Sequence, residues 1–326
     1  MENTQTRERI YSIDDFRGVA VILMFLANFI YLFTDAPPLL FDHARSGMVL
    51  PLDLVAPFFG FALGVSFPFL RDKFEPSGFK QRIAKRVILL YIIGKTPHLL
   101  YRYILVGEDI TTAFVLSWSI LETWAFSFIL AYLLIGLNPL RRILFSAAFL
   151  AAYQALLLNV EEIRNYANNT AEGGLAAVLS WTFIIVLGTV LGDMIKKELN
   201  EELYRKGIIC SIFFIASGLI LHLSSIIPME RLEVSASYIL FSSGISVLLF
   251  LFFHFKSLSC SVLIRSIGKY PLQAWLLQGL FYVPIYLTVG SSYFNWPLGG
   301  GLAVSGIIIL SAVNKKLLKA GISIKV

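Results

Sequence analysis

The sequence predicts an all-α integral membrane protein, a polytopic bundle of about ten transmembrane helices that forms a single domain over residues 1–326. The first observation is composition, because 57% of the residues are hydrophobic and only 15% are charged. The second is a mean hydropathy of +0.75. Soluble domains typically contain about 25% charged residues. The chain therefore falls in the membrane class, and the lipid bilayer is its first expected partner.

Apolar runs long enough to cross a bilayer divide the chain into its predicted helices. A crossing helix needs about 20 mostly apolar residues. The third run is the least regular, because Lys95, Pro97, His98 and Arg102 interrupt it, and we expect it to be broken or to line a cavity. The ten predicted spans are 16–35, 49–70, 84–106, 113–136, 141–159, 174–194, 207–226, 234–254, 267–289 and 297–314.

The distribution of basic residues predicts the orientation. If the N-terminus is cytoplasmic, 22 Lys and Arg residues fall on the cytoplasmic side and 5 on the other, out of 27 in the chain. This asymmetry follows the positive-inside rule. We therefore expect a protein of the cell membrane with both termini in the cytoplasm. The net charge of +6 reflects these basic loops, and no nucleic-acid partner is expected.

Two glycine pairs with helical spacing predict close helix packing. They are Gly60 with Gly64 and Gly188 with Gly192. Small residues four positions apart let two helices approach closely in lipid. Packing within one chain is the favoured interpretation, and a homodimer contact is the alternative.

Four polar residues within or beside the apolar spans are the candidates for chemistry. They are Asn28, His43, Asp53 and Glu122. Ionisable groups in a bilayer usually line a cavity, form a pair or take part in chemistry. His43 could exchange a proton near neutral pH, with either Asp42 or Asp53 orienting its ring or stabilising the imidazolium. Taken alone, each residue also has a structural explanation, such as a helix–helix hydrogen bond from Asn28 or a protonated, hydrogen-bonded Glu122.

No metal is expected as a cofactor. The other three histidines, His98, His222 and His254, have no metal-like spacing to one another or to carboxylates. Motifs for ATP binding, serine hydrolysis and zinc proteolysis are missing from the sequence as well.

Several segments of the N-terminal third resemble the heparan-alpha-glucosaminide N-acetyltransferase family. They are SIDDFRGVA at 12–20, MFLAN at 24–28, His43-Ala44 and DLVAPFF at 53–59. Later matches are looser and include Glu172-Gly173, followed by Gly188 and Gly192. The segment Leu276-Leu277-Gln278 resembles the bacterial YeiB-like membrane proteins of the same superfamily.

The resemblance implies a transmembrane acyltransferase that moves an acetyl group from cytosolic acetyl-CoA, or another acyl-CoA, to an acceptor across the membrane. It makes His43 the active-site histidine and Asn28 the active-site asparagine, with Asp53 as a third catalytic candidate. Glu122 and Gln278 stand where the family commonly has Gln-Arg and Gly-His-Glu. The candidates for acyl-CoA binding are Arg17, Arg82, Lys85, Arg86, Glu122 and Gln278.

The acceptor and the chemical route stay open at this stage. The long outer loop of the heparan-modifying enzymes is missing, so we expect a smaller saccharide or lipid-linked acceptor of the cell envelope. His43 either removes a proton from the acceptor or carries the acyl group itself. The alternative function is a transporter or flippase, with a pathway lined by Asn28, Asp53, Lys95 and Glu122.

Overall fold

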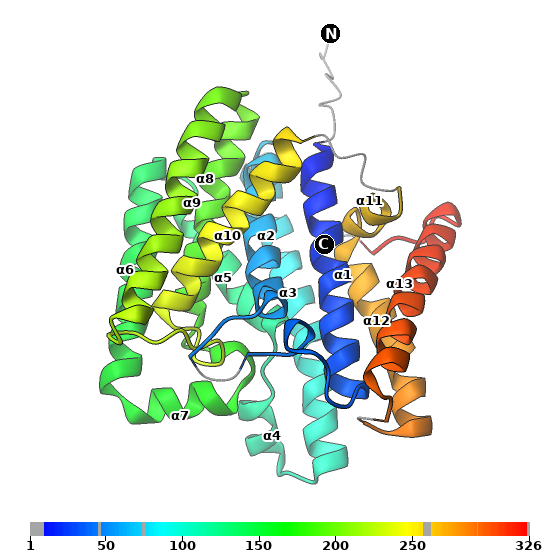
Figure 1. Ribbon diagram of the computed structural model, residues 1–326. Coiled ribbons are helices and arrows are strands. Elements are labelled where there is room, and N and C mark those ends of the chain that lie inside the picture. Colours follow the sequence, from blue (N-terminus) through cyan, green and yellow to red (C-terminus); the bar gives the residue numbers. More distant parts are fainter. Residues whose placement is uncertain (1–9, 45–46, 74–75, 257–261, 292, 325–326) are drawn as a thin grey trace. The chain divides into compact units, whose positions relative to one another are not determined.

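The structure is a computed structural model that describes residues 10–44, 47–73, 76–256, 262–291 and 293–324. Within these residues the fold is helical, and its one β-type contact is an isolated bridge between Thr34 and Phe294. The all-α prediction is therefore confirmed (Figure 1). The α-helices are α1 (Tyr11–Phe33), α2 (Val55–Lys73), α3 (Pro76–Leu100), α4 (Ile110–Leu116), α5 (Ile120–Leu134), α6 (Pro139–Asn159), α7 (Glu161–Asn169), α8 (Val178–Lys196), α9 (Asn200–Leu223), α10 (Ala236–Phe255), α11 (Val262–Gly268), α12 (Pro271–Val289) and α13 (Trp296–Lys319). Short helical turns are η1 (Leu39–Phe41), η2 (Pro51–Leu54), η3 (Tyr101–Val106) and η4 (Ala171–Gly173).

Each predicted span coincides with helix, but two of them are irregular. Among the described residues, 8 helical segments are long and apolar enough to cross a membrane, or 9 if the bent pair α4 and α5 counts as one span. The two helices of that pair meet at 62°. The third predicted span lies in α3, whose charged residues exclude it from this set, and it continues as the π-helix η3. The sharp break thus falls in the fourth predicted span and not in the third.

The chain forms two compact units. The first contains Met1–Ala36 and Leu249–Lys325, and the second contains Pro37–Leu248. The expectation of a single domain stays a prediction.

In the first unit, α1 packs against α11, α12 and α13. Arg265 of α11 binds the carboxylate of Asp15 through two hydrogen bonds of 2.9 and 2.7 Å. Two parallel bonds of this kind fix both position and angle. On α12, the Tyr282 hydroxyl donates to the backbone oxygen of Phe25 at 2.7 Å. Polar contacts therefore hold both helices to α1.

In the second unit, α2 and α8 pack closely through the predicted glycine pairs. A Cβ atom on Gly64 would lie 2.0 Å from the Ile185 oxygen, and one on Gly188 would lie 2.4 Å from the Phe61 oxygen. Such distances leave no room for any side chain. The interpretation as packing within one chain is confirmed.

At its C-terminal end, α8 is tied to its neighbours by ion pairs. Asp193 lies 2.6 Å from Nη2 of Arg142 on α6 and 3.7 Å from Nη2 of Arg71 on α2. Lys196 pairs with Asp72. At the other end of the second unit, the short helix α7 lies crosswise beneath α6, α8 and α9 (Figure 1). The two ends of these helices therefore differ in structure.

The predicted orientation can be tested by cysteine labelling in a variant that lacks Cys210 and Cys260. Glu162 in α7 and Lys80 in α3 are both exposed. We expect Glu162→Cys to react with a membrane-impermeant maleimide in intact cells, and Lys80→Cys to react only after permeabilisation, because of the positive-inside asymmetry. The opposite labelling pattern would reverse the topology.

Candidate active site

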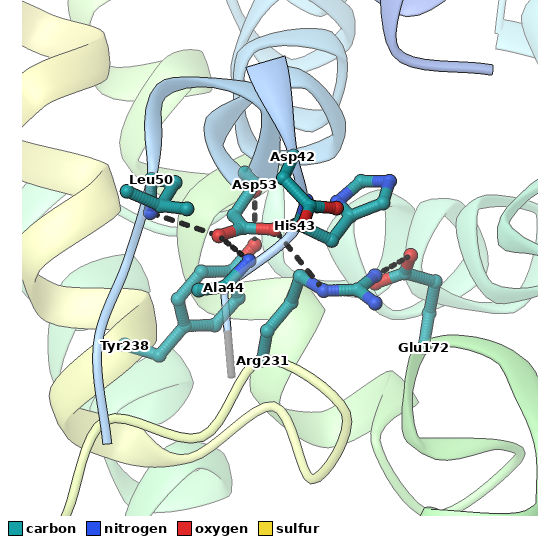
Figure 2. A network of polar contacts seen from close by, with 8 residues as sticks. All are labelled: Asp42, His43, Ala44, Leu50, Asp53, Glu172, Arg231 and Tyr238. Atoms are coloured by element: carbon teal, nitrogen blue, oxygen red, sulfur yellow. Dashed lines mark hydrogen bonds and ion pairs between the residues drawn. The ribbon is translucent and has the colours of Figure 1, made fainter. Parts of the chain in front are cut away.

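A histidine and an aspartate ten residues apart form the centre of the site (Figure 2). Nδ1 of His43 lies 2.8 Å from Oδ1 of Asp53. The His43 side chain is 23% exposed, whereas the Asp53 side chain is fully enclosed. When Nδ1 donates its hydrogen to the carboxylate, the ring lone pair sits on Nε2. This arrangement is that of a histidine base oriented by a carboxylate.

The Asp53 carboxylate is held by the backbone as well. Its Oδ2 atom accepts the backbone N–H groups of Leu50 at 2.8 Å and of Ala44 at 3.1 Å. The first of these bonds caps η2, and the second ties down the residue after His43. The backbone oxygen of Asp53 accepts the Tyr238 hydroxyl at 2.6 Å. Asp53 is therefore fixed at both its main chain and its side chain, which fixes the ring of His43 in turn.

An arginine and a second carboxylate extend the network (Figure 2). Nε of Arg231 lies 3.2 Å from Oδ1 of Asp53, the same oxygen that binds His43. Nη1 of Arg231 lies 3.4 Å from Oε1 of Glu172. Three separate parts of the chain therefore meet here: the segment before α2, the turn before α8 and the loop before α10.

Glu172 occupies an unusual backbone conformation. Its φ of 53° is in the left-handed region, which non-glycine residues rarely adopt and which often marks a functional site. Its backbone oxygen accepts the indole N–H of Trp181 at 3.2 Å. Burial raises the pKa of the Glu172 carboxyl, although the positive charge of Arg231 opposes this effect. A partly buried carboxyl with a raised pKa that is paired with an arginine is a candidate member of a functional site.

A pocket of about 440 Å³ adjoins this network within the second unit. Such a volume is in the range of small-molecule sites. Ala44 and Arg231 belong both to the pocket wall and to the network. The other polar residues of the wall are Gln154, Arg164, Asn168, Glu230, Glu233 and Ser235.

Three predicted site residues belong to the first unit. Asn28 is half-buried in α1. Arg17 lies 3.9 Å from Asp14, one turn earlier in the same helix. Gln278 of α12 is 5% exposed, and its Oε1 atom has no hydrogen-bond partner among the described residues. The expected pairing of Asn28 with His43 stays a prediction.

The basic residues of α3 lie in the second unit. Arg82 and Lys85 are exposed, and the Arg86 guanidinium lies 4.7 Å from the ring centre of Phe128. These three cations share one helix but do not all face solvent.

Glu122 is paired with a cation inside the protein. It is fully buried, and its Oε1 atom lies 3.1 Å from Nζ of Lys95. Nζ also donates to the backbone oxygens of Phe114 and Ser117 at the break between α4 and α5. The Glu122 carboxylate accepts the backbone N–H of Ser119 at 2.9 Å and so caps α5. These contacts give Glu122 a structural role, and its proposed contact with acyl-CoA stays a prediction.

The sequence profile of the catalytic domain of heparan-alpha-glucosaminide N-acetyltransferase matches residues 9–206. The chain belongs to this family. Membership indicates a transmembrane enzyme of the N-acetyltransferase type and implies a co-substrate of the acyl-CoA class. No curated protein matches the chain. The matched region contains His43, Asp53 and Glu172, whereas Arg231 lies beyond it.

The sequence pointed to His43, with Asp42 or Asp53 as its partner, and the structure pairs the ring with Asp53. Glu172 and Arg231 had no role predicted from the sequence. For Glu172 there was a local signal, since Gly173 and Gly174 follow it and both have positive φ. For Arg231 the sequence contains no such signal, because one arginine in a loop predicted to lie outside is not unusual enough to mark a functional residue. In the part of the chain that the structure describes, no group of three or more His, Cys, Asp or Glu side chains could hold a metal ion.

The buried pair predicts a large and specific loss of stability. Lys95→Met leaves the Glu122 carboxylate without its cation, which we expect to cost about 3–5 kcal/mol. The double variant Lys95→Met/Glu122→Leu should recover most of this loss. The measurement is the midpoint of thermal unfolding in detergent.

A matched control is Arg102→Gln, which removes the cation of the more exposed Arg102–Glu108 pair. An exposed pair contributes about 0–1 kcal/mol. If Lys95→Met and Arg102→Gln melt alike, the buried pair does not stabilise the bundle.

Proposed function

We propose that the protein transfers an acyl group from cytosolic acyl-CoA to an amine or hydroxyl of a small saccharide or lipid-linked acceptor on the outer side of the membrane. The observation that carries this proposal is the His43–Asp53 pair, in which a partly exposed imidazole contacts a buried carboxylate. A base built in this way suits an acceptor whose nucleophile must lose a proton.

In the direct route, the acceptor nitrogen or oxygen attacks the thioester carbonyl. A bond from the acceptor to the acyl carbon forms, and the bond from that carbon to the CoA sulfur breaks. Nε2 of His43 takes the proton of the acceptor, and that proton finally reaches the departing thiolate. The negative charge of Asp53 stabilises the imidazolium between these steps.

In the alternative route, Nε2 of His43 attacks the thioester carbonyl, so that a bond from Nε2 to the acyl carbon forms and the bond to the CoA sulfur breaks. The acceptor then attacks this acyl carbon, the bond to Nε2 breaks, and the proton of the acceptor passes to the CoA thiolate. Both routes use the same contact between Nδ1 and Asp53. Asn28 is proposed to donate a hydrogen bond to the carbonyl oxygen as it gains negative charge.

The pocket beside the network is proposed to hold the acceptor. Its wall combines cations, carboxylates and amides, which suit the hydroxyl and amine groups of a sugar. Its position supports this assignment, because Ala44 follows His43 directly and lines the pocket.

The acyl-CoA is proposed to bind near the basic part of α3. Arg82 and Lys85 are exposed and lie three positions apart on this helix, so both cations can face the phosphates of CoA. Arg17, Arg86, Glu122 and Gln278 remain secondary candidates.

A carrier function has less support. A transporter was considered because the Glu122 carboxylate lies inside the helix bundle. In the structure, Glu122 has Lys95 and a backbone N–H as partners. Because the charge of Lys95 balances that of Glu122, the buried carboxylate is explained without a transported ion.

The proposed role of His43 predicts a loss of chemistry without a loss of donor binding. His43→Ala should abolish acyl transfer, and Asn28→Ala should lower kcat by about a hundredfold. The affinity for acetyl-CoA should change little, because the base acts on the acceptor. The measurements are CoA release in a single turnover with glucosamine and related acceptors, and calorimetry with acetyl-CoA.

The control is His98→Gln, since the ring of His98 hydrogen-bonds to the backbone oxygen of Gly94 in its own helix. It should transfer acyl groups at the wild-type rate. A well-folded His43→Ala variant with wild-type turnover would remove the basis of this active site.

Replacement of the exposed cations should weaken donor binding. We expect Arg82→Gln/Lys85→Gln to raise the KM for acetyl-CoA about tenfold or more and to leave the KM for the acceptor unchanged, because two charge-assisted contacts to phosphate are lost. Steady-state kinetics with each substrate varied in turn would measure this. An unchanged KM for the donor would place the CoA phosphates elsewhere.

A further inference from the structure

One carboxylate oxygen serves two groups that can both be positively charged. Oδ1 of Asp53 lies 2.8 Å from Nδ1 of His43 and 3.2 Å from Nε of Arg231. The arginine is always charged, whereas the imidazole is charged only when it is protonated. An aspartate can orient a histidine ring without a second cation at the same oxygen. The presence of Arg231 beside Oδ1 of Asp53 therefore needs its own explanation.

Several side chains hold the loop that carries Arg231 in place. The Tyr153 hydroxyl of α6 donates to the Glu233 backbone oxygen at 2.6 Å, and the Ser180 hydroxyl of α8 donates to the Val234 backbone oxygen at 2.9 Å. Within the loop, Ser235 Oγ accepts the Glu230 backbone N–H at 3.0 Å. A loop fixed from two helices places the guanidinium accurately.

We infer that Arg231 is a positioning residue that limits how much of the Asp53 negative charge acts on His43, and thereby sets the pH range in which the imidazole can serve as a base. This inference concerns the same site and rests on the proposed function for its meaning in catalysis. The effect of Arg231 on the charge around His43 does not depend on which reaction the site catalyses.

The direction of the effect follows from the charges around the ring. The carboxylates of Asp42, Asp53 and Glu172 favour the imidazolium form, and the Arg231 guanidinium opposes it. Without the guanidinium, Asp53 would act on His43 alone, and the ring would keep its proton to higher pH. Because an imidazole must be neutral to accept a proton, we expect the guanidinium to widen the pH range in which His43 can act as a base.

Glu172 holds the Arg231 guanidinium on the side away from Asp53. Its Oε1 atom lies 3.4 Å from Nη1, so the guanidinium spans two carboxylates and cannot turn away from Asp53 without leaving Glu172. The left-handed backbone of Glu172 and the bond from Trp181 fix this second anchor.

The test measures the protonation of His43 without an activity assay. Diethyl pyrocarbonate modifies neutral imidazole, and the rate for the peptide that contains His43 can be followed by mass spectrometry from pH 5 to 8.5. We expect Arg231→Gln to move the midpoint of the rate upward by about one pH unit. Arg231→Lys keeps the charge and should stay near the wild-type midpoint.

Two further variants make the result decisive. Arg231→Gln/Glu172→Gln removes cation and carboxylate together, which avoids an unpaired buried charge. It should move the midpoint upward by less than Arg231→Gln does, because the lost carboxylate charge offsets part of the lost guanidinium charge. Arg102→Gln removes another arginine of an ion pair elsewhere in the second unit and should not move it. An unchanged or lower midpoint in both folded Arg231→Gln variants would overturn the inference.

The kinetic arm separates this inference from the proposed function. In the acyl-transfer assay, the acidic limb of the kcat/KM profile of Arg231→Gln should move upward together with the modification midpoint. If the wild type transfers no acyl group to any acceptor, the proposed function fails, while the modification midpoints still decide the role of Arg231.

Discussion

The site depends on the need to satisfy one buried carboxylate. Asp53 is 2% exposed, and an unpaired charge at such a position would be costly. Its two oxygens are therefore occupied by an imidazole, a guanidinium and two backbone N–H groups. Each of these partners stays in place because losing it would leave part of the buried charge unpaired. The position of the histidine is thus a consequence of charge burial in an apolar bundle.

Helix packing decides which residues reach this carboxylate. Asp53 precedes α2 and Glu172 precedes α8, so the contact between these two helices sets the distance between the residues at their beginnings. Gly64 and Gly188 let the backbones touch. Bulkier residues would separate the helices and move Glu172 away from the arginine that bridges it to Asp53. A packing motif far from the site therefore contributes to its geometry.

The family match and the network do not have the same extent. The profile ends at residue 206, whereas the network is completed by Arg231 and by the Tyr238 hydroxyl at the start of α10. A shared N-terminal region supplies the histidine and its carboxylate, and the later segment supplies the group that competes for that carboxylate.

The sequence by itself determined the helical class, the approximate spans and the choice of His43 as the candidate base. Apolar runs must become helices in lipid, but the sequence left Asp42 and Asp53 as alternative partners of the ring, and only the structure placed the Asp53 carboxylate against Nδ1. Tertiary structure alone decided the partner of Glu122 and the place of Arg231. Lys95 lies 27 positions before Glu122, and Arg231 lies 178 after Asp53, so no local pattern records either contact. Such pairs form because buried charges take partners from whichever segments the helix packing brings close.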